Sequence, residues 1–62
     1  MKEQLLNEVT ELHDVLRKLD LVWNDLDWSI VPDAVTEQYP FHMDLKQMTE
    51  SVKIWRDSIS NS

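Results

Sequence analysis

The stretch that decides the fold is LLNEVTELHDVLRKLDLVWNDLDWSI, residues 5–30, because apolar residues recur through it with one unbroken helical spacing. They are separated alternately by four and three residues, which places them on one side of an α-helix as the a and d positions of a heptad repeat. Every d position is leucine. The members of this first stripe are Leu5, Val9, Leu12, Leu16, Leu19, Trp23, Leu26 and Ile30. A stripe of nearly four heptads requires a partner, which the rest of the chain is expected to supply.

A second apolar stripe with the same spacing follows the two prolines. Its members are Phe41, Leu45, Met48, Val52, Trp55 and Ile59. Two amphipathic helices joined by a short connection pack as antiparallel neighbours. The sequence therefore predicts an all-α fold, a single helical-hairpin domain over residues 1–62. The helices are expected at about 2–29 and about 41–59, with a connection at about 30–40. The two stripes are predicted to form the hairpin core and the dimer contact.

The ends of the first helix and the form of the connection follow from the prolines. Glycine is absent from the chain and the first proline is Pro32, so nothing interrupts the helix before Val31, which precedes that proline. We expect the helix to end between residues 27 and 30. Pro32 at a first helical position predicts a short helical turn in the connection. Val35 and Tyr39, four residues apart, would then close the end of the hairpin.

The size of the chain favours an oligomer. Sixty-two residues lie near the limit at which one core offsets the loss of chain entropy, and there is no cysteine to supply a disulfide. Apolar residues also lie outside the two stripes, which widens the apolar surface beyond what one hairpin covers. They are Leu6, Val15, Leu21, Val22, Trp28, Met43 and Ile54. We predict a homodimer in which two hairpins form a four-helix bundle. A complex with a different protein and a monomer remain the alternatives.

The net charge of −6 is concentrated in the middle of the chain. No basic residue occurs between Lys18 and Lys46, where six acidic residues lie: Asp20, Asp25, Asp27, Asp33, Glu37 and Asp44. Such a field repels the phosphate backbone of nucleic acids and attracts basic surfaces. The sequence therefore predicts a protein partner with a basic surface and no direct binding of nucleic acid.

Two surfaces are candidates for that partner, one acidic and one apolar. The candidate residues are Asp20, Asp25, Asp27, Asp33 and Glu37 on the acidic surface, with Leu21, Trp28 and Ile54 on the outer apolar one. Trp23 and Trp55 lie on the stripes and are assigned to the core. Trp28 either packs under the connection or contacts the partner, since aromatic anchors are typical of interfaces.

No pattern of catalytic or metal-binding residues is recognised. Glu8 and Glu11 form an E-x-x-E pair, but they fall at g and c positions, away from the core, without a matching pair on the second stripe. His13 and His42 are too far apart in a hairpin to share an ion. With no cysteine nucleophile and no glycine-rich phosphate loop, the sequence predicts no enzyme, no cofactor and no metal.

The function predicted from these features is a small, acidic, non-enzymatic protein–protein interaction module. Its composition resembles that of small regulators and accessory proteins of phages and mobile elements. One alternative is an acidic mimic of nucleic acid that inhibits a nuclease or another DNA-binding protein, and another is a purely structural assembly piece. No run approaches the roughly 20 apolar residues of a membrane span, and the N-terminus lacks a signal-peptide layout. We therefore expect no membrane association and a cytoplasmic location, in the host cell if the protein is encoded by a phage.

Overall fold

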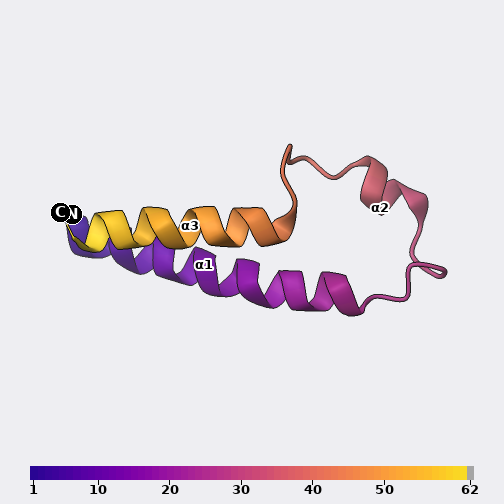
Figure 1. Ribbon diagram of the computed structural model, residues 1–62, viewed down its shortest axis with the longest axis horizontal. Helices are drawn as coiled ribbons and strands as arrows, with labels where there is room; N and C mark the ends of the chain where they lie inside the picture. Colours follow the sequence, from indigo (N-terminus) through magenta and orange to yellow (C-terminus); the bar gives the residue numbers. More distant parts are fainter. Residues whose placement is uncertain (62) are drawn as a thin grey trace.

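Two long helices and one short helix make up the fold. The structure is a computed structural model that describes residues 1–61, and its helices are α1 (Lys2–Asp25), α2 (Asp33–Glu37) and α3 (Leu45–Ser60). α1 and α3 lie side by side and run in opposite directions, with both chain ends at one end and the connection at the other (Figure 1). No strand occurs in residues 1–61. The prediction of an all-α hairpin with a short helical turn in its connection is confirmed.

α1 ends earlier than predicted. Its last residue is Asp25, and Leu26 is already extended, with φ −65° and ψ 141°. The carboxylate of Asp27 accepts hydrogen bonds from the Ser29 backbone N–H at 3.1 Å and from the Ser29 hydroxyl at 2.6 Å. The Ile30 N–H donates to the carbonyl of Asp27 at 3.1 Å. Aspartate and serine side chains thus give the backbone an alternative to the helix, so the predicted end at residues 27–30 is wrong. Ile30 is exposed, outside the stripe.

α3 begins later than predicted. Asp44 is its N-cap, and the carboxylate of this residue accepts a 2.7 Å hydrogen bond from the backbone N–H of Gln47. This bond satisfies one of the N–H groups that a helix start leaves without a partner. Phe41, the expected first residue, lies before the helix and packs instead edge-on against Tyr39, at 5.3 Å between ring centroids. The start at about 41 is therefore wrong, and the connection spans residues 26–44.

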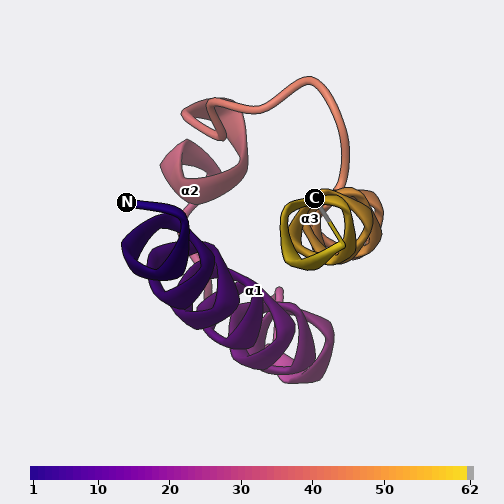
Figure 2. The same cartoon turned by 90° about the vertical axis from the view of Figure 1, so that its left-hand side faces the viewer.

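α2 is the short helical turn predicted after Pro32, which serves as its N-cap. The N–H groups of Val35 and Tyr39 close its ends by donating to Pro32 and Thr36. α2 and the flanking connection lie on one side of the α1/α3 pair when the molecule is viewed along its length (Figure 2). Val35 is exposed and does not close the end of the hairpin. Only Tyr39 of that predicted pair is partly buried.

The core of the described chain is small. Only Val9 and Leu16 of α1 and Leu45 of α3 are buried hydrophobic residues in residues 1–61. α3 is about two turns shorter than α1, so it leaves the last part of α1 to the connection. A single hairpin therefore encloses much less apolar surface than its two stripes provide.

Candidate functional site

The leucine row of α1 points away from the α1/α3 contact. Five residues of α1 are partly buried beside Val9 and Leu16. Three of them follow the leucines by one position and occupy heptad position e (Leu6, His13 and Asp20), and the other two are Trp23 at an a position and Asp14 at an f position. The leucines at d remain half exposed, with Leu5 at 47%, Leu12 at 42% and Leu19 at 42%. α1 therefore contacts α3 through its a and e positions, whereas the sequence predicted a and d.

α3 shows the same rotation. Thr49 and Arg56, which occupy e positions, are partly buried beside Val52, whereas Trp55, at a d position, is 49% exposed. Trp55 was predicted to be core, and in the single chain it is not. Met48, the other d residue of this helix, is partly buried because the connection covers it.

The exposed d positions of the two helices lie on the same side of the hairpin. In an antiparallel pair the e positions of both helices border one side, so the d and g positions of both helices border the other. We call this surface the open leucine face, and it consists of Leu5, Leu12, Val15, Leu19 and Val22 of α1 and Trp55 of α3, all exposed. Glu8 is the one charged residue at a g position of α1. The opposite side carries Arg17, Lys46 and Lys53 at b positions and is strongly polar.

The connection borders the open leucine face at the closed end of the hairpin. The hydroxyl of Tyr39 donates to the carbonyl of Met43 at 2.7 Å and lies 4.0 Å from the sulfur of Met48. The Tyr39 ring also packs on Trp23, with 5.7 Å between centroids. Since Met48 occupies a d position, these contacts place the connection on the same side as the exposed leucines.

Trp28 lies in the connection and packs against Trp23 near the end of α1. Its ring meets Trp23 edge-on, at 4.7 Å between centroids and an angle of 70°. Such edge-to-face geometry is favourable for aromatic pairs. Trp28 is still 39% exposed, so part of the indole remains accessible.

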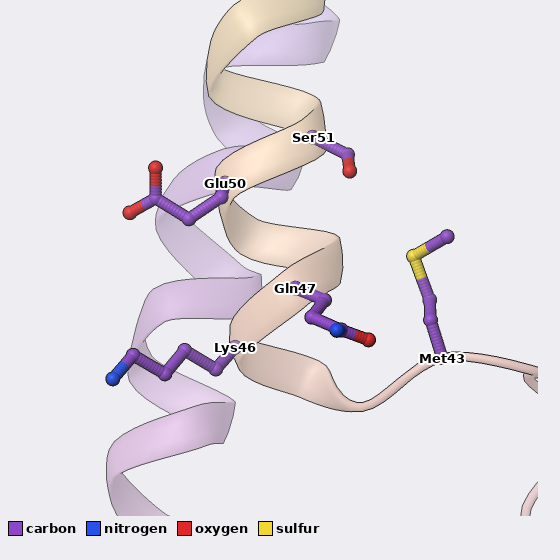
Figure 3. A pocket seen from close by; sticks show the side chains of 5 residues that line it. All are labelled: Met43, Lys46, Gln47, Glu50 and Ser51. Carbon is purple, nitrogen blue, oxygen red and sulfur yellow. The ribbon is translucent and has the colours of Figure 1, made fainter.

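Two hollows lie beside the start of α3. The first, of about 210 Å³, is almost wholly apolar and is lined by Phe41, His42, Met43, Met48, Ser51 and Val52. The second, of about 490 Å³, is an open groove on the outer side of the helix, lined by Met43, Lys46, Gln47, Glu50 and Ser51 (Figure 3). In the second, Lys46 and Glu50 point away from Met43, whereas Gln47 and Ser51 point to its side, so the two charged groups do not converge on a ligand position there.

The predicted acidic residues are spread over three elements. Asp20 is partly buried on α1, Asp25 is the last residue of α1, Asp27 lies in the following turn, and Asp33 and Glu37 begin and end α2. The hydroxyl of Ser29, with its backbone N–H, holds the pKa of Asp27 below the ordinary value of 3.8. The four exposed residues among them, Asp25, Asp27, Asp33 and Glu37, form an acidic border around the closed end rather than a chelating cluster.

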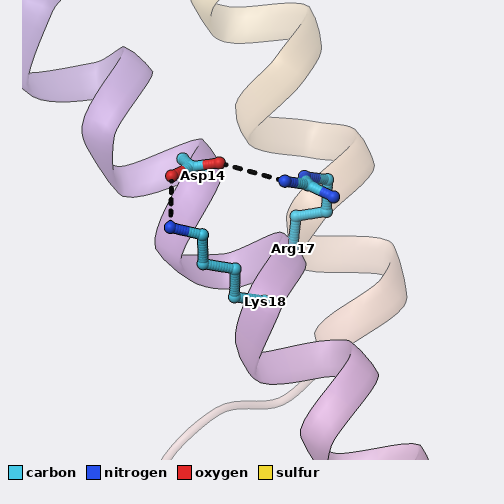
Figure 4. Close-up of polar contacts among 3 residues, drawn as sticks. All are labelled: Asp14, Arg17 and Lys18. Atoms are coloured by element: carbon cyan, nitrogen blue, oxygen red, sulfur yellow. Dashed lines mark hydrogen bonds and ion pairs between the residues drawn. The ribbon is translucent and has the colours of Figure 1, made fainter.

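Two basic residues of α1, Arg17 and Lys18, form ion pairs within their own helix. The carboxylate of Asp14 pairs with Lys18 at 3.0 Å and with Arg17 at 3.2 Å (Figure 4). The hydrogen bond from Lys18, followed by that from Arg17, lowers the pKa of Asp14. All three side chains are about half exposed, so these i, i+3 and i, i+4 pairs add little stability. Asp14 thus partly neutralises the positive charge of Arg17 and Lys18.

The predicted outer apolar surface is not a single surface. Leu21 and Ile54 are both exposed, but they lie at f and c positions of different helices, outside the α1/α3 contact and the open leucine face. The sequence does contain a pattern that distinguishes the open leucine face from the side of α1 that contacts α3. Valines at g positions, Val15 and Val22, extend the leucine row to one side, whereas the e positions include the polar His13 and Asp20.

Residues 1–61 contain no group of three or more histidine, cysteine or acidic side chains placed to hold a metal ion. No helix in that part of the chain combines the length and apolarity needed to cross a bilayer. Comparison of the chain with protein-family models, with curated proteins and with solved structures finds no match.

Proposed function

We propose that this protein is a non-enzymatic protein–protein interaction module whose hairpin pairs with a second copy through the open leucine face, forming a four-helix bundle. The observation that carries the proposal is the half exposure of Leu5, Leu12, Leu19 and Trp55 on one largely apolar side of the hairpin. Contiguous exposed apolar surface of this kind marks an interaction site in a soluble protein.

The available area suits a dimer. The six side chains of the open leucine face each expose on the order of 80 Å², so two copies would bury roughly 1,000 Å², the size at which specific interfaces begin. The small intrachain core supports the same conclusion, because chains of this size usually gain stability by oligomerisation. The dimer is expected to form at micromolar concentration.

The acidic border of the connection is the proposed surface for a second, basic protein. Asp25, Asp27, Asp33 and Glu37 are exposed there, and the chain has no base between Lys18 and Lys46 to neutralise them. A field of one sign raises the association rate of an oppositely charged partner. The same border supports the alternative function, an acidic mimic of nucleic acid that occupies the basic site of a nuclease or another DNA-binding protein.

Light scattering coupled to size exclusion tests the pairing. We expect a mass near twice 7.4 kDa for the natural chain. Leu12→Asp should remove the dimer, because a buried unpaired carboxylate costs several kcal/mol. Ile54→Asp is the matched control, since Ile54 is exposed on the outer side of α3, and it should stay dimeric. A 7.4 kDa species at high micromolar concentration for the natural chain would contradict the proposal.

Neutralising the acidic border tests the basic partner. A tagged protein captures its partner from its native cell, and a variant with Asp25, Asp27 and Asp33 changed to Asn and Glu37 changed to Gln is compared with it. Binding should fall mainly through the association rate and should depend less on salt. Binding of this variant at the natural rate would exclude the acidic border. Competition between the protein and DNA for the captured partner distinguishes the nucleic-acid mimic from an ordinary interaction module.

A further inference from the structure

We infer the arrangement of the two copies: they pair with their closed ends at opposite ends of the dimer, Leu12 lies at the two-fold axis, and Trp55 enters the apolar pocket of the partner copy. This inference rests on the dimer proposed above. It goes beyond that proposal by specifying which residues of the two copies are in contact.

The connection selects the direction of pairing. Two hairpins that stack face to face have their closed ends either at the same end or at opposite ends. Tyr39 places the connection on the same side as the open leucine face, through its contacts with Met43 and Met48. Closed ends at the same end would force two connections into the space between the hairpins. With closed ends at opposite ends, each connection instead faces the open end of the partner hairpin and not the other connection, and each α1 lies antiparallel on the other α1.

The leucine spacing fixes the register of that pair. Leu5, Leu12 and Leu19 are seven residues apart, about 10.5 Å along the helix, and are therefore symmetric about Leu12. A symmetric interface requires each contact to occur twice, in reciprocal form. Leu12 then meets Leu12 of the partner copy, and Leu5 meets Leu19 of the partner copy at both ends.

The same axis brings Trp55 to the partner's pocket. Both chain ends lie at one end of the hairpin (Figure 1). From the helix bounds and the rise of about 1.5 Å per residue, Leu12 of α1 is then level with about residue 50 of α3. Trp55 lies roughly five residues from that level, toward the C-terminus. The two-fold axis therefore places it against the partner's α3 at about residue 45, roughly five residues from the same level toward the N-terminus of that helix. That part of α3 borders the 210 Å³ pocket lined by Phe41, Met43 and Met48.

The pocket suits a side chain better than a small molecule. Its volume is below the roughly 300–1,000 Å³ of typical small-molecule sites, and its lining is apolar. Trp55 is a large, half-exposed aromatic residue on the same face, one turn from Ser51 at the edge of the pocket. Tryptophan is also the residue type most typical of interface anchors.

Cysteine crosslinking tests the arrangement, because the natural chain contains no cysteine. Leu12→Cys should give a covalent dimer by itself with a short thiol-specific crosslinker. Leu5→Cys alone and Leu19→Cys alone should react poorly, whereas a mixture of these two variants should give the crosslinked heterodimer. If the closed ends lay at the same end, α1 would lie on the partner's α3. The Leu12→Cys variant would then crosslink to the Ser51→Cys variant more readily than to a second Leu12→Cys copy, and this result would overturn the arrangement.

Trp55 is tested by dimer dissociation. Trp55→Ala should raise the dimer dissociation constant about 10- to 100-fold, and the neighbouring Ile54→Ala should change it less than about twofold. Equal effects of the two variants would exclude the pocket contact. A natural chain that is monomeric in light scattering contradicts the proposed function. A natural dimer that does not crosslink through Leu12→Cys overturns this arrangement alone.

Discussion

Leu12→Ala and Leu16→Ala make the same chemical change one turn apart, but we expect them to destabilise different species. Leu16 is 6% exposed in the single chain, so its truncation leaves a cavity in the hairpin core. A Leu→Ala change in a core costs about 2–5 kcal/mol, and about 2–3 kcal/mol is expected in a core as small as this one. That cost is comparable to the whole stability of a domain of this size and should not depend on protein concentration.

Leu12 is 42% exposed in the single chain, so its truncation should weaken mainly the dimer. The change removes on the order of 50 Å² of apolar contact per copy, or about 2–3 kcal/mol per dimer at 25 cal/mol per Å². This corresponds to roughly 30- to 150-fold in the dimer dissociation constant. Urea unfolding followed by circular dichroism, at about 2 µM and about 200 µM protein, separates the two effects by mass action.

The concentration dependence decides the outcome of this comparison. The Leu12→Ala protein should differ strongly from the natural chain only at the higher concentration, whereas Leu16→Ala should be less stable at both. If Leu12→Ala lowers the stability at 2 µM as much as Leu16→Ala does, Leu12 belongs to the core of the single chain. The reasoning from the rotated α1/α3 contact would then be refuted.

Three further predictions concern the cap, the pH dependence and metal ions. Asp44→Ala should lower the free energy of unfolding by about 1 kcal/mol through loss of the N-cap bond to Gln47, and Asp44→Ser should retain most of it, as measured by urea unfolding. The native partners of Asp14 and Asp27 lower the pKa values of these carboxyl groups. The two groups therefore stabilise the folded state above pH 3.8, and this stabilisation is lost as the pH falls through their pKa values in the folded protein. The melting temperature should therefore drop between about pH 4 and pH 2, less steeply in Asp14→Asn; a flat profile would show that these contacts do not persist in solution. Magnesium, calcium, zinc or a chelator should leave the melting temperature unchanged within about one degree, and a saturable rise would reveal a metal site.

The heptad spacing was sufficient to predict the hairpin, because an apolar stripe over many turns has few structural solutions in a chain without glycine. Element ends were less predictable. Leu26 and Ile30 continue the first stripe, yet the side chain of Asp27 bonds to Ser29 and turns the chain out of the helix. In the same way, Phe41 continues the second stripe, but the helix begins only after the Asp44 cap. Local side-chain hydrogen bonds, which periodicity does not detect, decided both ends.

The candidate site was predictable in composition but not in orientation. A stripe with leucine at every d position indicates which residues need burial, and it does not say which neighbour buries them. The hairpin itself uses the a and e positions, so polar His13 and Asp20 are partly covered while Leu12 and Leu19 remain open. The direction of this rotation depends on how the connection crosses to α3, and no local pattern encodes that path.

The aromatic packing at the closed end gives the protein two separate optical reporters. Trp23 and Trp28 meet at 4.7 Å and 70°, a geometry in which the transitions of the two indoles couple and contribute to circular dichroism. Trp55 stands alone on α3, where its emission responds to water at the open leucine face. Closure of the connection and coverage of the face can therefore be followed independently in one unlabelled sample. Rapid-mixing experiments that record both signals would establish which of the two events comes first.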